Sequence, residues 1–551
     1  MKKKGNILYV SIMFTAVLLV FFMSISSCKK IPNPYADSDE KDTITYDLLK
    51  TSIVVQFFDA NTNEYIIAEE GEKFTVRIVG KPKDAVADIV GLQKDEYNPR
   101  KGMLTFGLVP GAESVPSTTS PIRFTIVAQS NNYLISTKEV IITSEGDYLV
   151  KIFMVNTDNP PQGVSINRLY SVGNLVNGIL QDDISIATAN SEATVIIPAG
   201  TKLLRNDSIE LAGKLNLTLA YYSNMEDNAL ASFTGGITGT VMDNYSINSG
   251  VFFPAGMLTL DITDSDWHKA SIIENDSIEI VLEITEETYN PVSGSNIVSG
   301  DEVSFYSYLP DTGLWVIDQS VYITDTLLGV MSVSVKTTGL HSYNFSWFEE
   351  NNCNQGSSFE ITGNCMQCSS VMIEGVVRKL ADNSFVSNIS CIGKREDPLN
   401  IPFSTGGTPV YIEWGMGDEC YFCYVDPVVS PLMIDNMCTQ QLIEVPLLDG
   451  GPVSMSITAY FIGSCVSDTN IVVLPSFGVW VRPVDATCWR WSSMKNGVSK
   501  ICDVIYGETY VIGTYYNGIW QEWEVTITEE SEYVFDIEFS QSVCSWGFGI
   551  L

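Results

Sequence analysis

Histidine is nearly absent from this chain of 551 residues, which contains only His268 and His341. Imidazole is the most common general base near neutral pH and a common metal ligand, so the shortage argues against histidine-dependent catalysis and metal binding. The sequence also lacks Gly-x-Ser-x-Gly, His-Glu-x-x-His and a glycine-rich phosphate loop. We therefore predict no enzymatic activity and no cofactor. A carbohydrate-active enzyme that uses paired carboxylates is the remaining catalytic alternative.

Basic residues are also scarce, because 31 lysines and arginines stand against 66 aspartates and glutamates, for a net charge of −35. Nucleic-acid binding depends on basic side chains that displace phosphate counterions, so we predict no nucleic-acid partner. A polybasic membrane-binding patch is disfavoured for the same reason. Hydrophobic residues make up 45% of the chain, which is enough for packed cores and excludes wholesale disorder.

No sustained amphipathic helical pattern follows the N-terminal segment; alternation with a period of two residues dominates instead. Apolar residues recur at every second position in three clear segments: Phe74, Val76 and Ile78; Ile278, Ile280, Leu282 and Ile284; Tyr533, Phe535, Ile537 and Phe539. Gly, Pro, Asn and Asp clusters bound these segments. The pattern predicts an all-β chain of tandem β-sandwich domains, of the Ig-like or prealbumin-like kind.

Residues 1–27 have the layout of an export signal. Lys2, Lys3 and Lys4 precede an apolar run that extends from Ile7 to Met23. The run ends at Ile25-Ser26-Ser27-Cys28, which resembles a bacterial lipobox. The resemblance implies cleavage before Cys28 and acylation of that residue. An uncleaved transmembrane anchor is the alternative, because the apolar run almost spans a bilayer.

Residues 28–45 predict a solvated tether, because prolines and a charged cluster over residues 37–42 follow Cys28. The acylation of Cys28 that the resemblance implies would anchor the protein stably in a membrane. Some Gram-negative lineages use charged residues after the lipidated cysteine to direct lipoproteins to the outer face of the outer membrane. We therefore predict a lipid-anchored outer-membrane protein on the cell surface, with the periplasmic leaflet as the alternative.

Turn-rich breaks divide the remaining chain into four predicted domains. The first covers residues 46–157 and ends before Pro160-Pro161. The second covers 160–349 and ends at Glu349-Glu350-Asn351-Asn352. Asp449-Gly450-Gly451-Pro452 separates the last two domains, residues 351–448, which are rich in cysteine, and residues 452–551, which are rich in aromatic residues.

The second domain has an ordered series of short motifs. They are Ile197-Pro198-Ala199-Gly200-Thr201, Thr234-Gly235-Gly236, Phe253-Pro254-Ala255-Gly256, Gly300-Asp301-Glu302-Val303, Thr312-Gly313-Leu314-Trp315 and a closing His341-Ser342-Tyr343 with Trp347. Over residues 190–349 this order resembles the extracellular β-sandwich module of the cartilage intermediate layer protein family and its bacterial relatives. The closing motif departs from the family pattern. The resemblance implies an exported, non-catalytic domain and supplies no catalytic residues.

All cysteines other than Cys28 lie in the last two domains. The candidates for disulfides are Cys353, Cys365, Cys368, Cys391, Cys420, Cys423, Cys438, Cys465, Cys488, Cys502 and Cys544. The third domain has an odd number of them, so it leaves one over unless a bridge crosses to the fourth. The two Cys-x-x-Cys pairs have zinc-ribbon spacing, but an oxidising compartment favours disulfides. Zinc ligation and free thiols are the alternatives.

The last domain contains a hairpin whose two faces can be assigned. Asn517-Gly518 is a strong signal for a two-residue turn, which pairs Tyr515 with Trp520 and Ile512 with Trp523. Ile512 and Trp523 then belong to the core face. The opposite face is predicted to meet solvent and to stack on a sugar ring; its candidate ligand-binding residues are Tyr515, Trp520, Glu522 and Glu524. Trp489 and Trp491 alternate in the same way, so they share one face of their own segment and are further candidates. Stabilisation of the sheet, or contact with a neighbouring domain, is the alternative.

Asp261, Asp264 and Asp266 form a weak candidate calcium site, which lacks the glycine and final glutamate of an EF-hand. No other metal site is predicted. Taken together, the sequence predicts a non-enzymatic binding or adhesion lipoprotein whose C-terminal domain recognises a glycan. The alternative is a structural or accessory subunit of an outer-membrane protein assembly, in which the aromatic residues form a protein interface.

Overall fold

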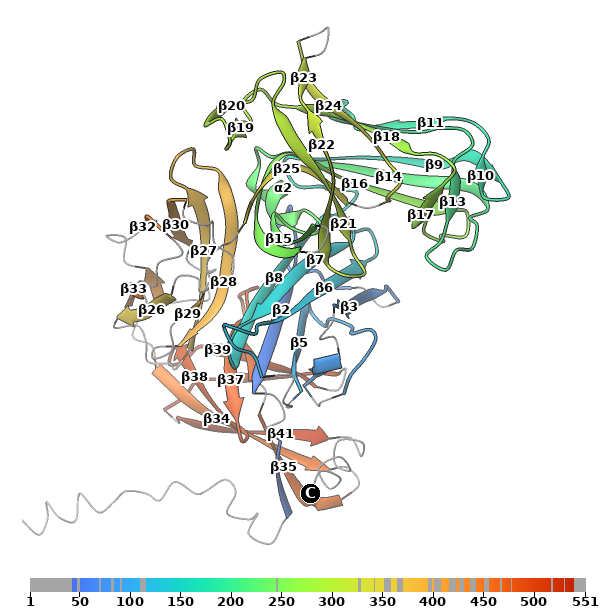
Figure 1. The fold of residues 1–551 in the computed structure, drawn as a ribbon. Helices are drawn as coiled ribbons and strands as arrows, with labels where there is room; N and C mark the ends of the chain where they lie inside the picture. The colour runs from blue at the N-terminus through green and yellow to red at the C-terminus, as the bar shows by residue number, and fades with distance from the viewer. Residues whose placement is uncertain are drawn as a thin grey trace, which may run out of the picture.

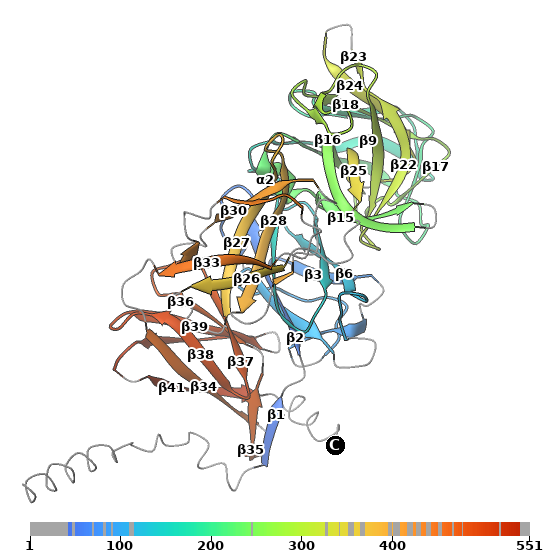
Figure 2. The same ribbon diagram turned by 60° about the vertical axis from the view of Figure 1, so that its left-hand side comes forward.

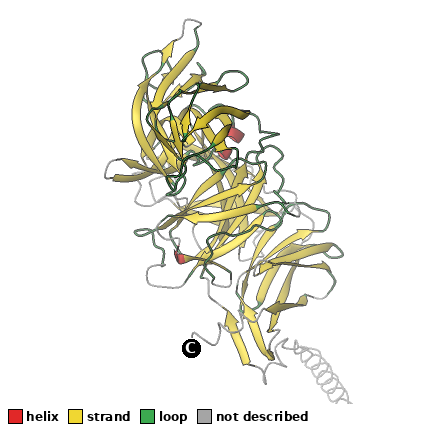
Figure 3. Ribbon diagram, turned by 90° about the vertical axis from the view of Figure 1, so that its right-hand side faces the viewer, coloured by secondary structure: helices red, strands yellow, loops and turns green. Residues whose placement is uncertain are grey.

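The computed structural model contains strands almost throughout and confirms the all-β fold class with tandem domains (Figures 1 and 3). One short helix, α2 (Asp227–Ser232), lies in the part of the chain that the structure describes. The described residues are 42–46, 50–68, 71–80, 84–89, 92–109, 115–243, 246–325, 329–340, 342–350, 358–363, 370–394, 399–400, 408–415, 423–425, 431–436, 442–449, 455–465, 468–476, 478–516, 519–529 and 531–539.

The first domain is a sandwich of two small sheets. One sheet has the order β4 (Val86–Asp88), β5 (Met103–Leu108), β2 (Thr51–Asp59), β8 (Gly146–Met154). The other has the order β3 (Phe74–Val79), β6 (Ile122–Ser130), β7 (Ser136–Ile142). Phe74 and Val76 are buried on the inner face, as the alternation predicts. β8 and β7 are edge strands of their sheets, and they lie on the side of the sandwich that meets the other domains.

The second domain is the largest and also has two main sheets. The first has the order β15 (Thr238–Asp243), β22 (Leu314–Tyr322), β21 (Glu302–Leu309), β25 (Ser342–Glu350), β16 (Ser246–Asp264), β14 (Gly213–Tyr222), β9 (Val164–Val176), β10 (Ile179–Leu180), β13 (Lys202–Leu204), β17 (Ile272–Glu274). The second has the order β11 (Ile184–Ala187), β12 (Ala193–Ile197), β18 (Ile278–Ile284), β24 (Met331–Thr337), β23 (Thr324–Asp325), and β19 (Tyr289–Asn290) pairs with β20 (Ser295–Asn296). β15 also pairs with β16, so five strands of the first sheet close into a ring.

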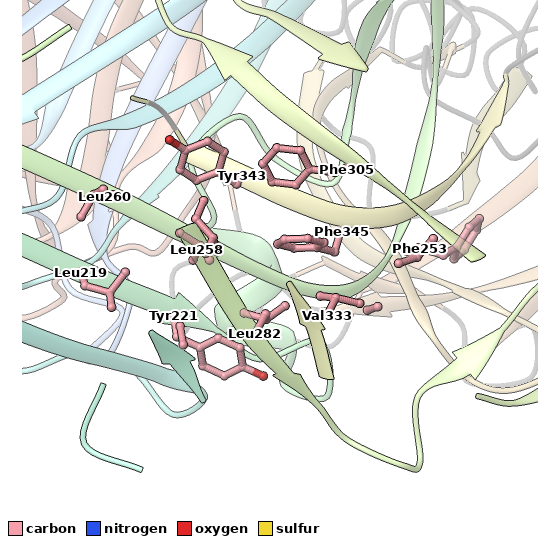
Figure 4. Close-up of a cluster of buried hydrophobic side chains, with 14 of the residues drawn as sticks. Leu219, Tyr221, Phe253, Leu258, Leu260, Leu282, Phe305, Val333, Tyr343 and Phe345 are labelled. Atoms are coloured by element: carbon pink, nitrogen blue, oxygen red, sulfur yellow. The ribbon is translucent and has the colours of Figure 1, made fainter. Parts of the chain in front are cut away.

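Apolar residues that alternate along these strands fill the space between the two sheets (Figure 4). Leu219 and Leu258 come from the large sheet, whereas Leu282 and Val333 come from the small sheet. The side chains of Ile278, Ile280, Leu282 and Ile284 are all buried, which confirms the predicted inner face of β18. Burial of each such side chain stabilises the folded domain by roughly 1.5–3 kcal/mol, so this core holds its two sheets together.

The third domain packs two four-stranded sheets together. Their orders are β29 (Leu399–Asn400), β26 (Ser358–Gly363), β33 (Leu442–Asp449), β31 (Cys423–Val425), and β28 (Phe385–Lys394), β27 (Ser370–Lys379), β30 (Val410–Gly415), β32 (Leu432–Ile434). Phe359 and Trp414 from the two sheets meet edge to face, with ring centroids 5.8 Å apart. β28 is an edge strand and faces β8 of the first domain.

The fourth domain is one sheet that curls over its own core. The order is β1 (Asp42–Tyr46), β35 (Asp468–Pro475), β34 (Met455–Cys465), β38 (Val498–Val504), β37 (Arg490–Lys495), β36 (Gly478–Pro483), β39 (Thr509–Tyr516), β40 (Ile519–Thr526), and β41 (Glu532–Phe539) also pairs with β34. Phe461 of β34 packs on Trp523 of β40 across the core, with ring centroids 5.9 Å apart. Phe535 and Ile537 are buried there, as their alternation predicts.

Strand β1 corrects the predicted boundary of the tether. Residues 42–45 are not a solvated linker, because Asp42–Tyr46 pairs in parallel with residues 471–475 of β35. The alternating Thr43, Ile44, Thr45 and Tyr46 have the β-branched and aromatic character that a strand favours. The N-terminal strand therefore belongs to the C-terminal domain, and the two ends of the described chain lie together.

The four domains fold back on one another in space. The fourth domain and β1 lie at one end of the molecule, the second domain lies at the other, and the first and third lie between them (Figures 1 and 2). Polar contacts join the domains. Arg378 of the third domain forms an ion pair with Asp227 of the second, and Lys151 of the first forms one with Glu374 of the third. Gly313, in the turn between β21 and β22 of the second domain, lies so close to Thr125 of the first that a Cβ atom there would clash with its hydroxyl.

Candidate functional site

The hairpin β39–β40 has the register that the two-residue turn predicts. Tyr515 pairs with Trp520, and Ile512 pairs with Trp523. Ile512 is fully buried and Trp523 packs against the same core, so the core face is also confirmed. The turn residues Asn517 and Gly518 lie outside the described residues.

The opposite face of this hairpin is only partly exposed to solvent: Glu522 and Glu524 are exposed, but the aromatic residues Tyr515 and Trp520 are partly buried, so the predicted open aromatic surface is wrong. Trp489 and Trp491 are only 5% and 7% exposed, and Trp520 is partly buried beside them. The rings of Trp489 and Trp520 meet edge to face at 5.3 Å. They pack in one cluster with residues of the first and third domains: Val54, Met103, Leu149, Met372 and Ile392. The aromatic residues therefore join three domains.

The polar groups of the same face also serve this interface. The Tyr515 hydroxyl donates a hydrogen bond of 3.0 Å to the backbone oxygen of Asn98 in the first domain. Glu522 forms an ion pair with Lys101 and accepts a hydrogen bond of 2.7 Å from Nε1 of Trp520. Partial burial acts to raise the pKa of Glu522. The hydrogen bonds that its carboxylate accepts from Lys101 and Trp520 outweigh this effect, so the pKa is lowered. Of the six candidates, only Glu524 is exposed with a side chain that has no hydrogen bond or ion pair among the described residues.

The three predicted calcium ligands do not converge on a site. In the part of the chain that the structure describes, no group of three or more acidic, cysteine or histidine side chains is arranged to hold a metal ion. Asp261 of β16 forms an ion pair with Lys269, which lies after the turn that follows this strand. Asp264 is 2% exposed and its Oδ1 accepts hydrogen bonds of 2.9 Å from the backbone N–H groups of Asp266 and His268. The carboxylate of Asp264 thus closes a turn of its own chain and does not serve as a metal ligand.

This turn presents Trp267, a residue that the sequence analysis overlooked. Trp267 is 70% exposed and its φ of +63° lies in the left-handed region, which is rare for a bulky side chain. Its backbone N–H donates a hydrogen bond of 3.0 Å to the backbone oxygen of Asp264, which closes the turn. Burial alone would raise the pKa of Asp264, but its hydrogen bonds with His268 and Asp266 lower it. Binding residues are enriched on loops, and strained backbone conformations cluster at functional sites, so Trp267 is a candidate recognition residue.

The cysteines of the described residues differ in state. Cys465, Cys488 and Cys502 are disulfide-bonded. Cys391 is a free thiol, which corrects its place among the disulfide candidates. Its Sγ lies 3.8 Å from the backbone oxygen of Ile373 on the neighbouring strand β27, and burial raises its pKa to about 12. Cys423 is described by its backbone alone. The other disulfide candidates lie outside the described residues: Cys353, Cys365, Cys368, Cys420, Cys438 and Cys544. Zinc ligation by the two Cys-x-x-Cys pairs therefore stays an alternative prediction.

The predicted signal of residues 1–27, the lipidation residue Cys28 and His341 also lie outside the described residues. No helix within the described residues is both long and apolar enough to span a bilayer.

A second feature that the sequence analysis missed is a cavity where three domains meet. It has a volume of about 240 Å³ and is lined by β7 and β8 of the first domain, by α2 and the segment after it in the second, and by β28 of the third. Lys138 and Glu139 of β7 and Cys391 of β28 are among its lining residues. No sequence signal identifies this cavity, because it depends on how the domains pack together.

No known protein family matches the chain, and no curated protein matches it. The resemblance of residues 190–349 to the cartilage intermediate layer protein module therefore stays a prediction. Three solved structures show weak likeness. The Bacillus anthracis TIE protein is 11% identical, with 76% of this chain and 71% of that chain covered and a TM-score of 0.13. The major pilin RrgB of Streptococcus pneumoniae is 8% identical, with 89% and 100% covered and a TM-score of 0.12. The minor pilin GBS52 of Streptococcus agalactiae is 10% identical, with 33% and 95% covered and a TM-score of 0.12. TM-scores this far below 0.5 support no statement about function.

Proposed function

We propose that the protein is a non-enzymatic binding lipoprotein of the bacterial cell surface, anchored at Cys28, whose second domain forms the membrane-distal binding end. The observation that carries this proposal is the parallel pairing of β1 with β35. The segment between Cys28 and Asp42 spans at most about 50 Å when fully extended. The fourth domain is therefore held close to the anchor, and the second domain lies at the opposite end of the molecule (Figure 1).

This geometry moves the expected binding surface away from the C-terminal domain. The aromatic face of that domain is occupied by the first and third domains. In the second domain, Trp267 offers an exposed indole on the turn between β16 and β17. An indole can stack on a sugar ring or enter an apolar pocket of a protein partner. We place the contact with a surface glycan or an outer-membrane protein at this end.

The test uses residues 28–551 with Cys28→Ser, purified from an oxidising compartment and screened against a glycan panel and against outer-membrane extracts. We expect Trp267→Ala to weaken binding at least about tenfold, as for an aromatic hot spot. The matched control is Tyr322→Ala, because Tyr322 is another exposed aromatic residue of the same domain. If binding is unchanged in Trp267→Ala but is lost in Glu524→Ala, the binding site lies in the C-terminal domain and not in the second domain. Stoichiometric co-purification with one membrane protein would instead identify an accessory subunit.

The anchoring part of the proposal has a separate test. In the native host, the unaltered protein should fractionate with the outer membrane, whereas Cys28→Ser should be released in soluble form. Epitope tags at residue 293 of the second domain and at residue 506 of the fourth should both be detected on intact cells. A tag signal that appears only after the cells are lysed would contradict surface display.

A further inference from the structure

The cavity at the three-domain junction arises because two edge strands face each other without pairing. β8 and β28 are both edges of their sheets, and they approach each other across the boundary between the first and third domains. Edge strands are usually paired or covered, since their backbone groups otherwise remain open. Here α2 of the second domain lies against both strands, so the crevice between them is covered without being filled.

One part of the cavity lining is apolar. Buried side chains from all three domains contribute to it, and they include Leu149 of the first domain, Leu230 and Ile237 of the second, and Phe385 and Ile392 of the third. The volume of about 240 Å³ lies just below the range of small-molecule sites. It therefore suits a slender apolar chain better than a large rigid ligand.

The charged lining residues are paired, with one exception among those whose contacts the structure describes. Glu139 forms an ion pair with Arg123 at 3.6 Å and accepts a hydrogen bond from Thr240. Lys151 forms an ion pair with Glu374 of the third domain. The side-chain ammonium group of Lys138 has no hydrogen bond or ion pair among the described residues, although Lys138 is half-buried in the lining.

The environment of Lys138 favours an anion. Burial lowers its pKa, and the charge of the neighbouring Glu139 only partly opposes this effect. Partial removal of an unpaired ammonium group from water is costly, and a bound carboxylate offsets that cost by forming a charge-assisted hydrogen bond. The cation and the apolar wall therefore define two parts of one site.

We propose that this cavity binds a small amphiphile with one anionic head group and an unbranched apolar chain, with the head group at Lys138 and the chain between the three domains. This inference is independent of the proposed function. Such a ligand contacts the first, second and third domains together, so its binding also stabilises their packing.

The experiment measures binding of decanoate below its critical micelle concentration to residues 28–551 carrying Cys28→Ser, by titration calorimetry. 1-Decanol is the neutral probe of the same chain length. We expect Lys138→Met to weaken decanoate binding at least about tenfold and to leave decanol binding unchanged, because only the charged contact is removed. Lys73→Met is the control, since Lys73 is an exposed lysine of the same domain that pairs with Glu96 at 3.6 Å, away from the cavity lining.

A second variant tests where the apolar chain of the ligand binds. Ala231→Phe adds a ring to a lining residue of α2, and it should weaken the binding of both probes, provided that the melting temperature shows a folded protein. Absence of decanoate binding to the unaltered cavity would overturn the proposal. Equal decanoate affinity in Lys138→Met, or binding of both probes that Ala231→Phe leaves unchanged, would overturn it as well.

Discussion

The hydroxyl group of Tyr515 lies 3.0 Å from the backbone oxygen of Asn98, and this hydrogen bond joins residues more than four hundred positions apart in the sequence. It fixes the hairpin of the fourth domain to the first domain, together with the ion pair between Lys101 and Glu522. Both charged groups are more than a third exposed, so that ion pair contributes only about 0.2–1 kcal/mol. The apolar cluster that contains the buried Trp489 and Trp491 also joins these domains, and burial of such large side chains is more stabilising than an exposed ion pair.

The first prediction concerns this hydrogen bond. Tyr515→Phe should lower the free energy of unfolding by about 0.5–1.5 kcal/mol, because the ring keeps its packing and only the hydroxyl contact is lost. Thr526→Val is the control, since its hydroxyl pairs with Thr509 on an exposed face of the same hairpin. Urea denaturation followed by tryptophan fluorescence measures both variants. Equal effects of the two substitutions would show that the contact with Asn98 adds nothing.

The register of the hairpin could be predicted from the sequence, but the partner of its second face could not. A two-residue turn determines which residues pair, and alternation separates the two faces. The local amino-acid sequence does not indicate whether solvent or another domain covers an aromatic face. The number of large aromatic residues on it exceeds what a solvent-exposed face usually carries, and this was the one available signal of an interface.

Two other features show the same limit. The carboxylate of Asp264 looks like a possible metal ligand in sequence, but in the structure its acceptor capacity is used by the backbone of its own turn. Lys138 looks like an ordinary surface lysine on a strand, and only the docking of two further domains places it in a cavity. The sequence specifies strands and their inner faces, whereas sites made by domain packing depend on contacts between distant segments.

The second prediction tests the pairing of the N-terminal strand with the C-terminal domain. Ile44→Pro removes a backbone N–H group and restricts the chain, so it should disrupt the ladder between β1 and β35. Hydrogen exchange of residues 471–474 should become faster, while exchange in β18 of the second domain should not change. Pro34→Ala, ahead of β1, is the control. Unchanged exchange in β35 would contradict the pairing and, with it, the membrane-proximal position of the fourth domain.

The third prediction concerns the pH dependence of the Asp264 turn. Its hydrogen bonds with His268 and Asp266 lower the pKa of Asp264 below that of an unfolded aspartate, near 3.9. A lowered pKa in the folded state means that the charged form stabilises the fold above pH ~4 and that this contribution is lost as the pH falls further. Asp264→Asn should therefore be less stable than the unaltered protein at pH 7, and the difference should shrink toward pH 3.

Urea midpoints measured from pH 3 to pH 7 test this prediction. Asp207→Asn is the control, because Asp207 lies in an exposed turn of the same domain and pairs with Arg205 at the surface. A difference between Asp264→Asn and the unaltered protein that stays constant with pH would show that the carboxylate charge does not stabilise the turn.

The fourth prediction concerns the free thiol of Cys391. Because burial raises its pKa to about 12, only a minute fraction is thiolate at pH 8, whereas an unfolded cysteine with a pKa near 8.5 is substantially ionised. Alkylation by iodoacetamide should therefore be roughly a thousandfold slower in the folded protein than in urea. Peptide mapping by mass spectrometry identifies the modified residue. A folded-state rate close to that in urea would mean that the strand β28 opens readily, and the cavity it lines would then not be a stable part of the fold.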